Sequence, residues 1–156
     1  NFSREYIHFM MDSTNKEQQM DVFVGLKTPK DEKAIKKYKI NKVQIFTEYD
    51  PKMVLMNDST YLLELDTLSH KGVDFIFRKK LKIKPEVLLS SILIKKGDTY
   101  NLTSVEQTYS RLQTLNQFKF LNIKFEESKN NVDSTYGQLN CVIQLTPHNL
   151  QYYSFE

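Results

Sequence analysis

Apolar and polar residues alternate in the first stretch of the chain, and this period of two is typical of a β-strand. Residues 6–13 place Ile7, Phe9 and Met11 on one side of the predicted strand. A polar turn region then leads to a second alternating stretch, residues 19–27. The pattern therefore predicts an antiparallel hairpin at the start of the chain.

A new unit is expected to begin near Tyr38, after a charged and weakly patterned linker at residues 30–37. Alternation in residues 40–50 predicts the first strand of this unit. Residues 51–72 have no clear period. Alternation returns in residues 73–80, which predict another short strand.

A first helix is predicted near residues 85–96. Pro85 suits a first helical position, and Glu86 favours the positive end of the helix dipole. An apolar stripe follows, formed by Leu88, Leu89, Ile92 and Leu93. Gly97 is expected to end this helix in the left-handed conformation that glycine adopts at little cost.

A second helix is predicted near residues 103–115. Thr103 and Glu106 have the spacing of a capping box, and Asn116 is an acceptable stop. The apolar positions at helical intervals are Val105, Tyr109, Leu112 and Leu115. Both helices therefore have one apolar side and are expected to cover a sheet.

Alternation then predicts two further strands, at residues 118–128 and 138–147, joined by a polar loop. This second hairpin repeats the pattern of the first. The matched positions are Ile7 with Ile123, Phe9 with Phe125, Met20 with Leu139, Val22 with Cys141, Val24 with Ile143 and Leu26 with Leu145. The repeat predicts a tandem array within a longer chain, with residues 1–29 as the last hairpin of a preceding module.

Connectivity predicts the topology of the complete module, an α+β unit of strand, helix, helix, strand, strand. Its first and last strands can pair in parallel while the final hairpin pairs antiparallel, so the predicted sheet is mixed and three-stranded, in the order first, third, second. Both helices are expected on one face of this sheet. The strand at residues 118–127 is left on an edge, with backbone groups open for pairing.

The net charge argues against nucleic-acid binding, and the motifs argue against catalysis. The formal net charge of +3 in 156 residues is far from the one-sided balance of a nucleic-acid-binding protein. No nucleophile elbow, phosphate loop, dinucleotide fingerprint or metal-binding spacing occurs, so no catalytic, metal-binding or cofactor-binding residue is expected. Cys141 lies on an alternating apolar side, as a buried and inert thiol would. His8, His70 and His148 are expected to be ordinary surface or partly packed residues.

Membrane and export signals are not predicted in this sequence. No apolar run approaches the ~20 residues of a membrane-spanning helix. The first ten residues lack the basic-then-apolar layout of a signal peptide. Any export signal or membrane part is therefore expected outside the given sequence.

Residues 97–125, GDTYNLTSVEQTYSRLQTLNQFKFLNIKF, with LNCVIQL at 139–145, resemble the polypeptide-transport-associated (POTRA) domains of outer-membrane assembly factors of the BamA type, especially those of Bacteroidetes-like bacteria. The matching glycine, aromatic and apolar positions are Gly97, Tyr100, Val105, Leu112, Leu115, Phe118 and Ile123. The resemblance covers residues 38–147 as one domain. It departs from the usual pattern at about 50–80, where an insertion replaces a short connection.

The resemblance implies a non-catalytic module on the periplasmic side of the outer membrane, in a factor that assembles or inserts β-barrel proteins. Implied partners are unfolded outer-membrane β-barrel proteins, accessory assembly lipoproteins and a membrane β-barrel of the same chain, whose first strand would begin in residues 148–156. Nucleic acid is not expected. One alternative is a POTRA domain of a two-partner secretion or TamA-like translocation pore.

A KH-like RNA-binding module is an alternative of another class, because the strand-helix-helix-strand core is similar and the isoelectric point is about 8.8. KH modules need a GXXG loop to approach the phosphate backbone. Residues 94–101, IKKGDTYN, contain one glycine in that place, Gly97. This departure makes RNA binding the weaker interpretation.

The mechanism that the resemblance implies is β-augmentation, in which a client strand adds to the edge of the sheet. The candidate binding residues are Phe118, Lys119, Phe120, Leu121, Asn122, Ile123, Lys124, Phe125 and Glu126. Lys124 is interpreted as an outward position. Proline there is expected to abolish peptide binding if the Lys124 amide faces the open edge.

Overall fold

The chain divides into two compact units, Asn1–Lys37 and Tyr38–Glu156. The computed structural model describes residues 7–12, 21–26, 36–128 and 136–148. Most of the predicted linker and the predicted barrel strand at the C-terminal end lie outside the described residues. The domain boundaries proposed from the sequence therefore stay predictions.

The first unit contains the predicted hairpin, formed by β1 (Ile7–Asp12) and β2 (Asp21–Leu26) in antiparallel pairing. Ile7 pairs with Leu26, whereas its counterpart in the second hairpin, Ile123, pairs with Ile143. The registers thus differ by two residues, which leaves every side chain on its own face. Large apolar side chains of this hairpin, such as Phe9, are exposed.

Among its described residues, the second unit has nine elements. They are β3 (Tyr38–Phe46), α1 (Pro51–Leu55), α2 (Ser59–Leu63), β4 (Leu65–His70), β5 (Val73–Arg78), α3 (Pro85–Ser91), α4 (Leu102–Thr114), β6 (Phe118–Glu127) and β7 (Gly137–Pro147). Its sheet has the order β4-β5-β3-β7-β6. β3 pairs in parallel with β5 and β7, whereas β4 with β5 and β6 with β7 pair antiparallel.

The predicted α+β class and strand-helix-helix-strand-strand order are confirmed by β3, α3, α4, β6 and β7. The order first, third, second is also confirmed, as β3-β7-β6. The prediction of a three-stranded sheet is wrong, because β4 and β5 of the insertion extend the sheet beyond β3. β5 joins the sheet because it buries its alternating residues Val73 and Phe75 beside β3.

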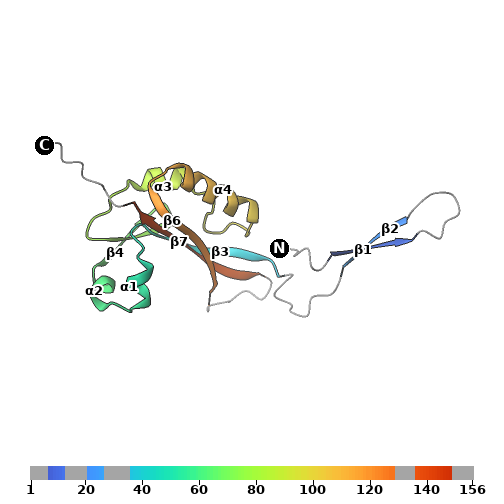
Figure 1. Ribbon diagram of the computed structural model, residues 1–156, viewed down its shortest axis with the longest axis horizontal. Helices are drawn as coiled ribbons and strands as arrows, with labels where there is room; N and C mark the ends of the chain where they lie inside the picture. Colours follow the sequence, from blue (N-terminus) through green and yellow to red (C-terminus); the bar gives the residue numbers. More distant parts are fainter. Residues whose placement is uncertain (1–6, 13–20, 27–35, 129–135, 149–156) are drawn as a thin grey trace. The chain divides into compact units, whose positions relative to one another are not determined.

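Both predicted helices lie on the same face of the sheet, where Figure 1 shows α3 and α4 side by side. Their buried residues join those of the central strands in one core. The fully buried side chains include Val43, Ile45, Phe75, Leu88, Leu112, Cys141, Ile143 and Leu145. Burial of this shared apolar surface is the main force that holds the helices on the sheet.

Helix α3 ends at Ser91 and not near residue 96, so the predicted helix stop is wrong. The chain turns extended at Ile92, and both Ile92 and Ile94 are buried in the core. The Leu93 N–H donates to the Thr108 hydroxyl at 3.0 Å. An extended segment places alternate β-branched residues in the core. Their burial favours the extended conformation over continuation of the helix.

Gly97 does have a left-handed φ of +90°, but it forms a turn between the helices. Its N–H donates to the Ile40 carbonyl at 2.7 Å, and the Ile40 N–H donates to the Asp98 carbonyl at 2.8 Å. The loop thereby pairs with the beginning of β3. The left-handed conformation is needed for this pairing rather than for a helix cap.

We expect Gly97→Val to lower the free energy of unfolding by more than ~1 kcal/mol, because a β-branched side chain is strained at positive φ. Thermal or denaturant melts measure the loss. Lys96→Val, on the preceding exposed residue, is the matched control and should change stability by less than about 0.5 kcal/mol. Equal stability of the two variants would contradict a strained position at Gly97.

Helix α4 begins one residue before the predicted start and is capped by Asn101, whose side chain accepts from the Thr103 N–H at 2.9 Å. The predicted capping role of Thr103 is therefore wrong. Asn116 has φ +50° and ends the helix as predicted. Tyr109 is 41% exposed, whereas Thr108 is fully buried, because Thr108 faces the Leu93 backbone.

Residues 51–72, which had no clear period, form α1, α2 and β4. Asp50 caps α1 and accepts from the Lys52 N–H at 2.9 Å. Asp58 caps α2 and accepts from the Thr60 N–H at 2.9 Å. These short helices lie apart from α3 and α4 (Figure 1).

Candidate peptide-binding site

All nine candidate residues lie in β6, which has β7 as its neighbour on one side and, among the described residues, no strand on the other. The predicted edge position is therefore confirmed. Its use as a peptide-binding site stays a prediction. The edge at the opposite end of the sheet is β4, which lies in the part of the sequence without a clear period.

The pairing of β6 with β7 decides which peptide groups face the open edge. At one end the Ser128 N–H donates to the Gln138 carbonyl at 2.8 Å, and at the other the His148 N–H donates to the Gln117 carbonyl at 3.0 Å. Opposite residues of an antiparallel pair alternate between hydrogen-bonded and non-hydrogen-bonded pairs. Counting by twos from Ser128, the hydrogen-bonded pairs are Glu126 with Asn140, Lys124 with Val142 and Asn122 with Gln144.

The peptide groups of Leu121, Ile123 and Phe125 therefore face away from β7, toward the open edge. The Lys124 amide faces β7, so Lys124 is not an outward backbone position. Proline at Lys124 would remove a hydrogen bond of the sheet rather than a donor at the edge. The sequence could not decide this, because only the register places an amide on one side of the strand.

The side chains of β6 separate into two faces. Leu121, Ile123 and Phe125 are partly buried and pack against the core beneath the helices. On the other face the Asn122 side-chain amide donates to Gln144 Oε1 at 3.0 Å, and Lys124 is exposed. The edge thus combines an apolar side, outward peptide groups and a polar side.

The regular strand geometry of this edge is interrupted at one end, and a side-chain hydrogen bond is formed at the other. A register irregularity between Phe118 and Phe120 leaves Lys119 as an extra residue. Such bulges and lysines are typical protections of exposed edges. At the other end the Tyr38 hydroxyl donates to Glu127 Oε1 at 2.9 Å. The regular part of the edge therefore runs from Leu121 to Phe125.

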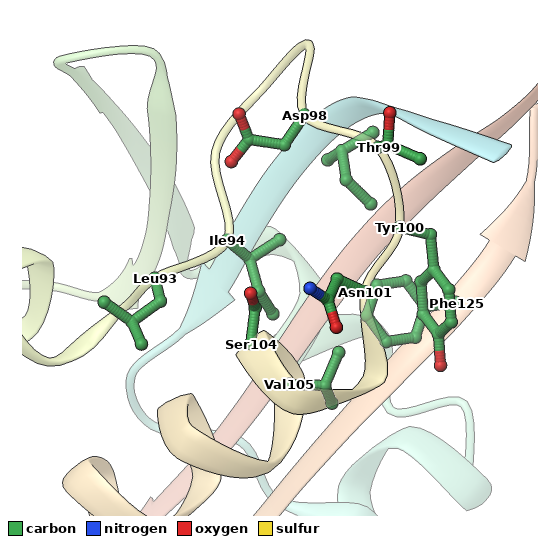
Figure 2. A pocket seen from close by; sticks show the side chains of 10 residues that line it. Leu93, Ile94, Asp98, Thr99, Tyr100, Asn101, Ser104, Val105 and Phe125 are labelled. Atoms are coloured by element: carbon green, nitrogen blue, oxygen red, sulfur yellow. The ribbon is translucent and has the colours of Figure 1, made fainter.

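A shallow pocket lies beside the Phe125 end of the edge, between the loop before α4 and the first turns of that helix. Tyr100 and Phe125 form one of its walls (Figure 2), in an edge-to-face contact with ring centroids 4.9 Å apart. Val105 and Leu93 are also among its lining residues. Its volume of about 20 Å³ is room for one water-sized group. It suits a small side chain and not a cofactor.

Cys141 and His70, the other residues with chemically notable side chains, have structural roles. Cys141 is fully buried, and burial raises the pKa of its thiol to about 12, so it is not a nucleophile at neutral pH. His70 Nε2 lies 3.1 Å from Glu86 Oε1 on α3. In the described part of the chain, no cluster of three or more His, Cys, Asp or Glu residues could hold a metal ion.

The Gly97 turn bears on the KH-like interpretation. The Gly97 amide is bonded to β3, which leaves it unable to hold a phosphate group as the KH-like interpretation requires. Among the residues that the structure describes, no helix is long and apolar enough to span a bilayer.

Comparisons with known proteins give weak likenesses. Neither a family model nor a curated protein matches the sequence. The chain is similar to the N-terminal domain of Omp85 from Thermosynechococcus elongatus, with a TM-score of 0.39, 9% identity and coverage of 92% of this chain and 76% of that one.

Two further solved structures are similar to a comparable degree. POTRA domains 1–3 of Anabaena Omp85 give a TM-score of 0.39 with 8% identity, over 92% of this chain and 75% of that one. POTRA domains 3–5 of Haemophilus influenzae BamA give 0.37 with 9% identity, over 89% and 70%. At these TM-scores the likenesses carry no weight of their own, so the architecture rests on the strand order and the core.

Proposed function

We propose that this chain is a substrate-receiving module of an outer-membrane β-barrel assembly or insertion factor, located on the periplasmic side. It binds unfolded client strands by β-augmentation at β6. The resemblance of residues 97–125 and 139–145 to POTRA domains supports the biological setting. The observation that carries the mechanism is the outward orientation of the Leu121, Ile123 and Phe125 peptide groups on an edge strand.

Main-chain pairing suits the handling of many different clients. An added strand would form hydrogen bonds with these peptide groups whatever its sequence, and its alternate side chains would lie beside the apolar side of β6. The small pocket at Phe125 offers little selectivity. We therefore expect weak affinity, roughly high-micromolar to millimolar, which allows release to the next site.

Amide hydrogen exchange on the wild-type protein gives a direct test. In the free protein, the amides of Asn122, Lys124 and Glu126 should exchange slowly, because they are bonded to β7. Those of Leu121, Ile123 and Phe125 should exchange faster, because they face the open edge. Adding a peptide from an outer-membrane β-barrel strand should slow the second set and leave the first set nearly unchanged.

A pair of variants at Ile123 separates the edge amide from the side chain. Ile123→Ala and Ile123→Pro both remove the same aliphatic group, but only proline also removes the outward N–H. We expect the alanine variant to bind the peptide and the proline variant to lose about tenfold or more in affinity, equivalent to ~1.4 kcal/mol. Amide spectra recorded without peptide establish that both variants are folded.

Protection that appears on α3, α4 or the β4 edge in place of β6 would contradict β-augmentation at this strand. Equal affinity of the two Ile123 variants would also contradict it. The two-partner secretion and TamA-like alternatives share this edge chemistry. They differ in their clients, so peptides from a secreted substrate tested beside barrel strands would distinguish them.

A further inference from the structure

The insertion carries a group of exposed apolar side chains that the proposed peptide-binding site does not use. They are Met53, Val54, Leu55, Met56, Leu62 and Leu63, all in or beside α1 and α2. Leu55 and Leu63 are each 86% exposed. Soluble proteins rarely gather large apolar residues in this way unless the patch binds something.

The fold of α1 and α2 does not depend on these side chains. None of the α1 residues is buried, and α2 buries Tyr61 alone. The Tyr61 hydroxyl donates to the Glu48 carbonyl at 3.1 Å, and the Asp50 and Asp58 side chains cap the two helices. The helices are therefore held by polar contacts and one aromatic ring, which leaves their leucines and methionines in water.

Residues 78–84, five of which are basic, form ion pairs with residues that flank these helices. Glu64 at the end of α2 pairs with Arg78 and also with Lys79, whose Nζ is 3.6 Å away. Glu48, before α1, pairs with Lys82. These ion pairs place the basic run beside the exposed apolar group, at the same end of the sheet.

Several cations on this surface remain unneutralised. Leu81 and Ile83 point into the core, so the alternating lysines of the run point outward. Lys80 and Lys84, together with Lys52 on α1, are exposed and have no carboxylate partner among the described residues. The insertion thus combines exposed apolar side chains on α1 and α2 with unpaired lysines on α1 and in the basic run, while its carboxylates Asp50 and Asp58 are engaged with backbone N–H groups of the two helices.

We propose that α1, α2 and residues 78–84, here called the insertion surface, dock onto a lipid bilayer that carries anionic phospholipids. The apolar side chains enter the boundary between headgroups and acyl chains, and the free lysines contact phosphate groups around them. This docking would hold the module at the membrane surface without a spanning segment. The inference does not rest on peptide binding at β6.

Charge complementarity favours a bilayer over a second copy of the chain. Two copies meeting through this surface would bring their unpaired lysines together, whereas an anionic headgroup layer neutralises them. The exposed residues are also flexible aliphatic side chains on two short helices. They can enter a fluid lipid layer without a partner groove shaped to receive them.

Co-sedimentation of the 156-residue chain with vesicles tests the proposal. Vesicles of phosphatidylcholine mixed with phosphatidylglycerol should bind the protein, and pure phosphatidylcholine vesicles should bind it more weakly. Added salt should reduce this difference, because it screens the contribution of the lysines. The double variant Leu55→Ser/Leu63→Ser should lose about tenfold or more in binding to the anionic vesicles.

Matched variants control for folding and for general charge. Leu102→Ser removes an exposed leucine at the start of α4, and it should bind as wild type. Lys80→Glu/Lys84→Glu should lose about tenfold or more in binding, since each basic residue near an anionic surface adds to the attraction. Lys95→Glu/Lys96→Glu makes the same charge change in the Gly97 turn, and it should have a much smaller effect. Thermal melts show whether each variant is folded.

Three outcomes would overturn the proposal. The wild-type protein could fail to sediment with anionic vesicles, or the Leu55→Ser/Leu63→Ser variant could bind them as well as wild type. In the third outcome, the wild-type chain forms a dimer and the same leucine variant is monomeric. That result would assign the surface to self-association. None of these results would alter the exchange pattern expected at β6, so the two proposals fail separately.

Discussion

Phe75→Ala is expected to lower the free energy of unfolding by about 3–5 kcal/mol, which is the usual cost of removing a fully buried phenylalanine. Phe75 is completely inaccessible and belongs to β5, where it pairs with Ile45 of β3. Its loss leaves a cavity between the sheet and the helices. Equilibrium unfolding in denaturant, followed by circular dichroism, measures the change.

Leu68→Ala is the matched control for this prediction. Leu68 lies opposite Phe75 on β4 but is 43% exposed. We expect the control to cost at most about 0.5 kcal/mol, as is usual for surface positions. A cost below about 1 kcal/mol for Phe75→Ala would mean that the insertion is an appendage of the module and that β5 does not complete its core.

Leu112→Ala is expected to remove about 2–5 kcal/mol, because Leu112 is the fully buried apolar residue of α4. Its side chain belongs to the core cluster that joins the helices to β3 and β7. Gln113→Ala, on the next and exposed residue, should change stability by less than about 0.5 kcal/mol. A loss below half a kilocalorie for Leu112→Ala would overturn the assignment of this helix face to the core.

These two predictions differ in how far they follow from the sequence. Leu112 recurs at helical intervals with Val105 and Leu115, so its burial could be predicted before the fold was known. Tyr109 has the same spacing and is exposed. Periodicity finds the apolar side of a helix, but the width of the buried stripe depends on what packs against it, and here the extended segment at Leu93 faces Thr108 instead.

The insertion shows a different limit. Alternation at residues 73–80 predicted the strand β5, and Asp50 followed by a proline, together with Asp58, were available as helix-start signals. β4 has a mostly exposed pattern with little alternation in it, because it lies at an edge and pairs with one strand. A strand with few buried residues shows little alternation of apolar and polar residues in its sequence.

The sequence by itself determined the elements with a strong period: both hairpins, the two helices on the sheet, and the edge position of residues 118–127. Burial on one side imposes a period of 2.0 or 3.6 on the residues of each element, and that period is readable without the fold. Tertiary structure alone decided where α3 ends, which β6 amides face outward, and that β3 is a central strand. Each of these depends on contacts between segments far apart in the chain, namely Leu93 with Thr108, β6 with β7, and β5 with β3. No local pattern records such contacts, because the free energy that selects them comes from the partner segment.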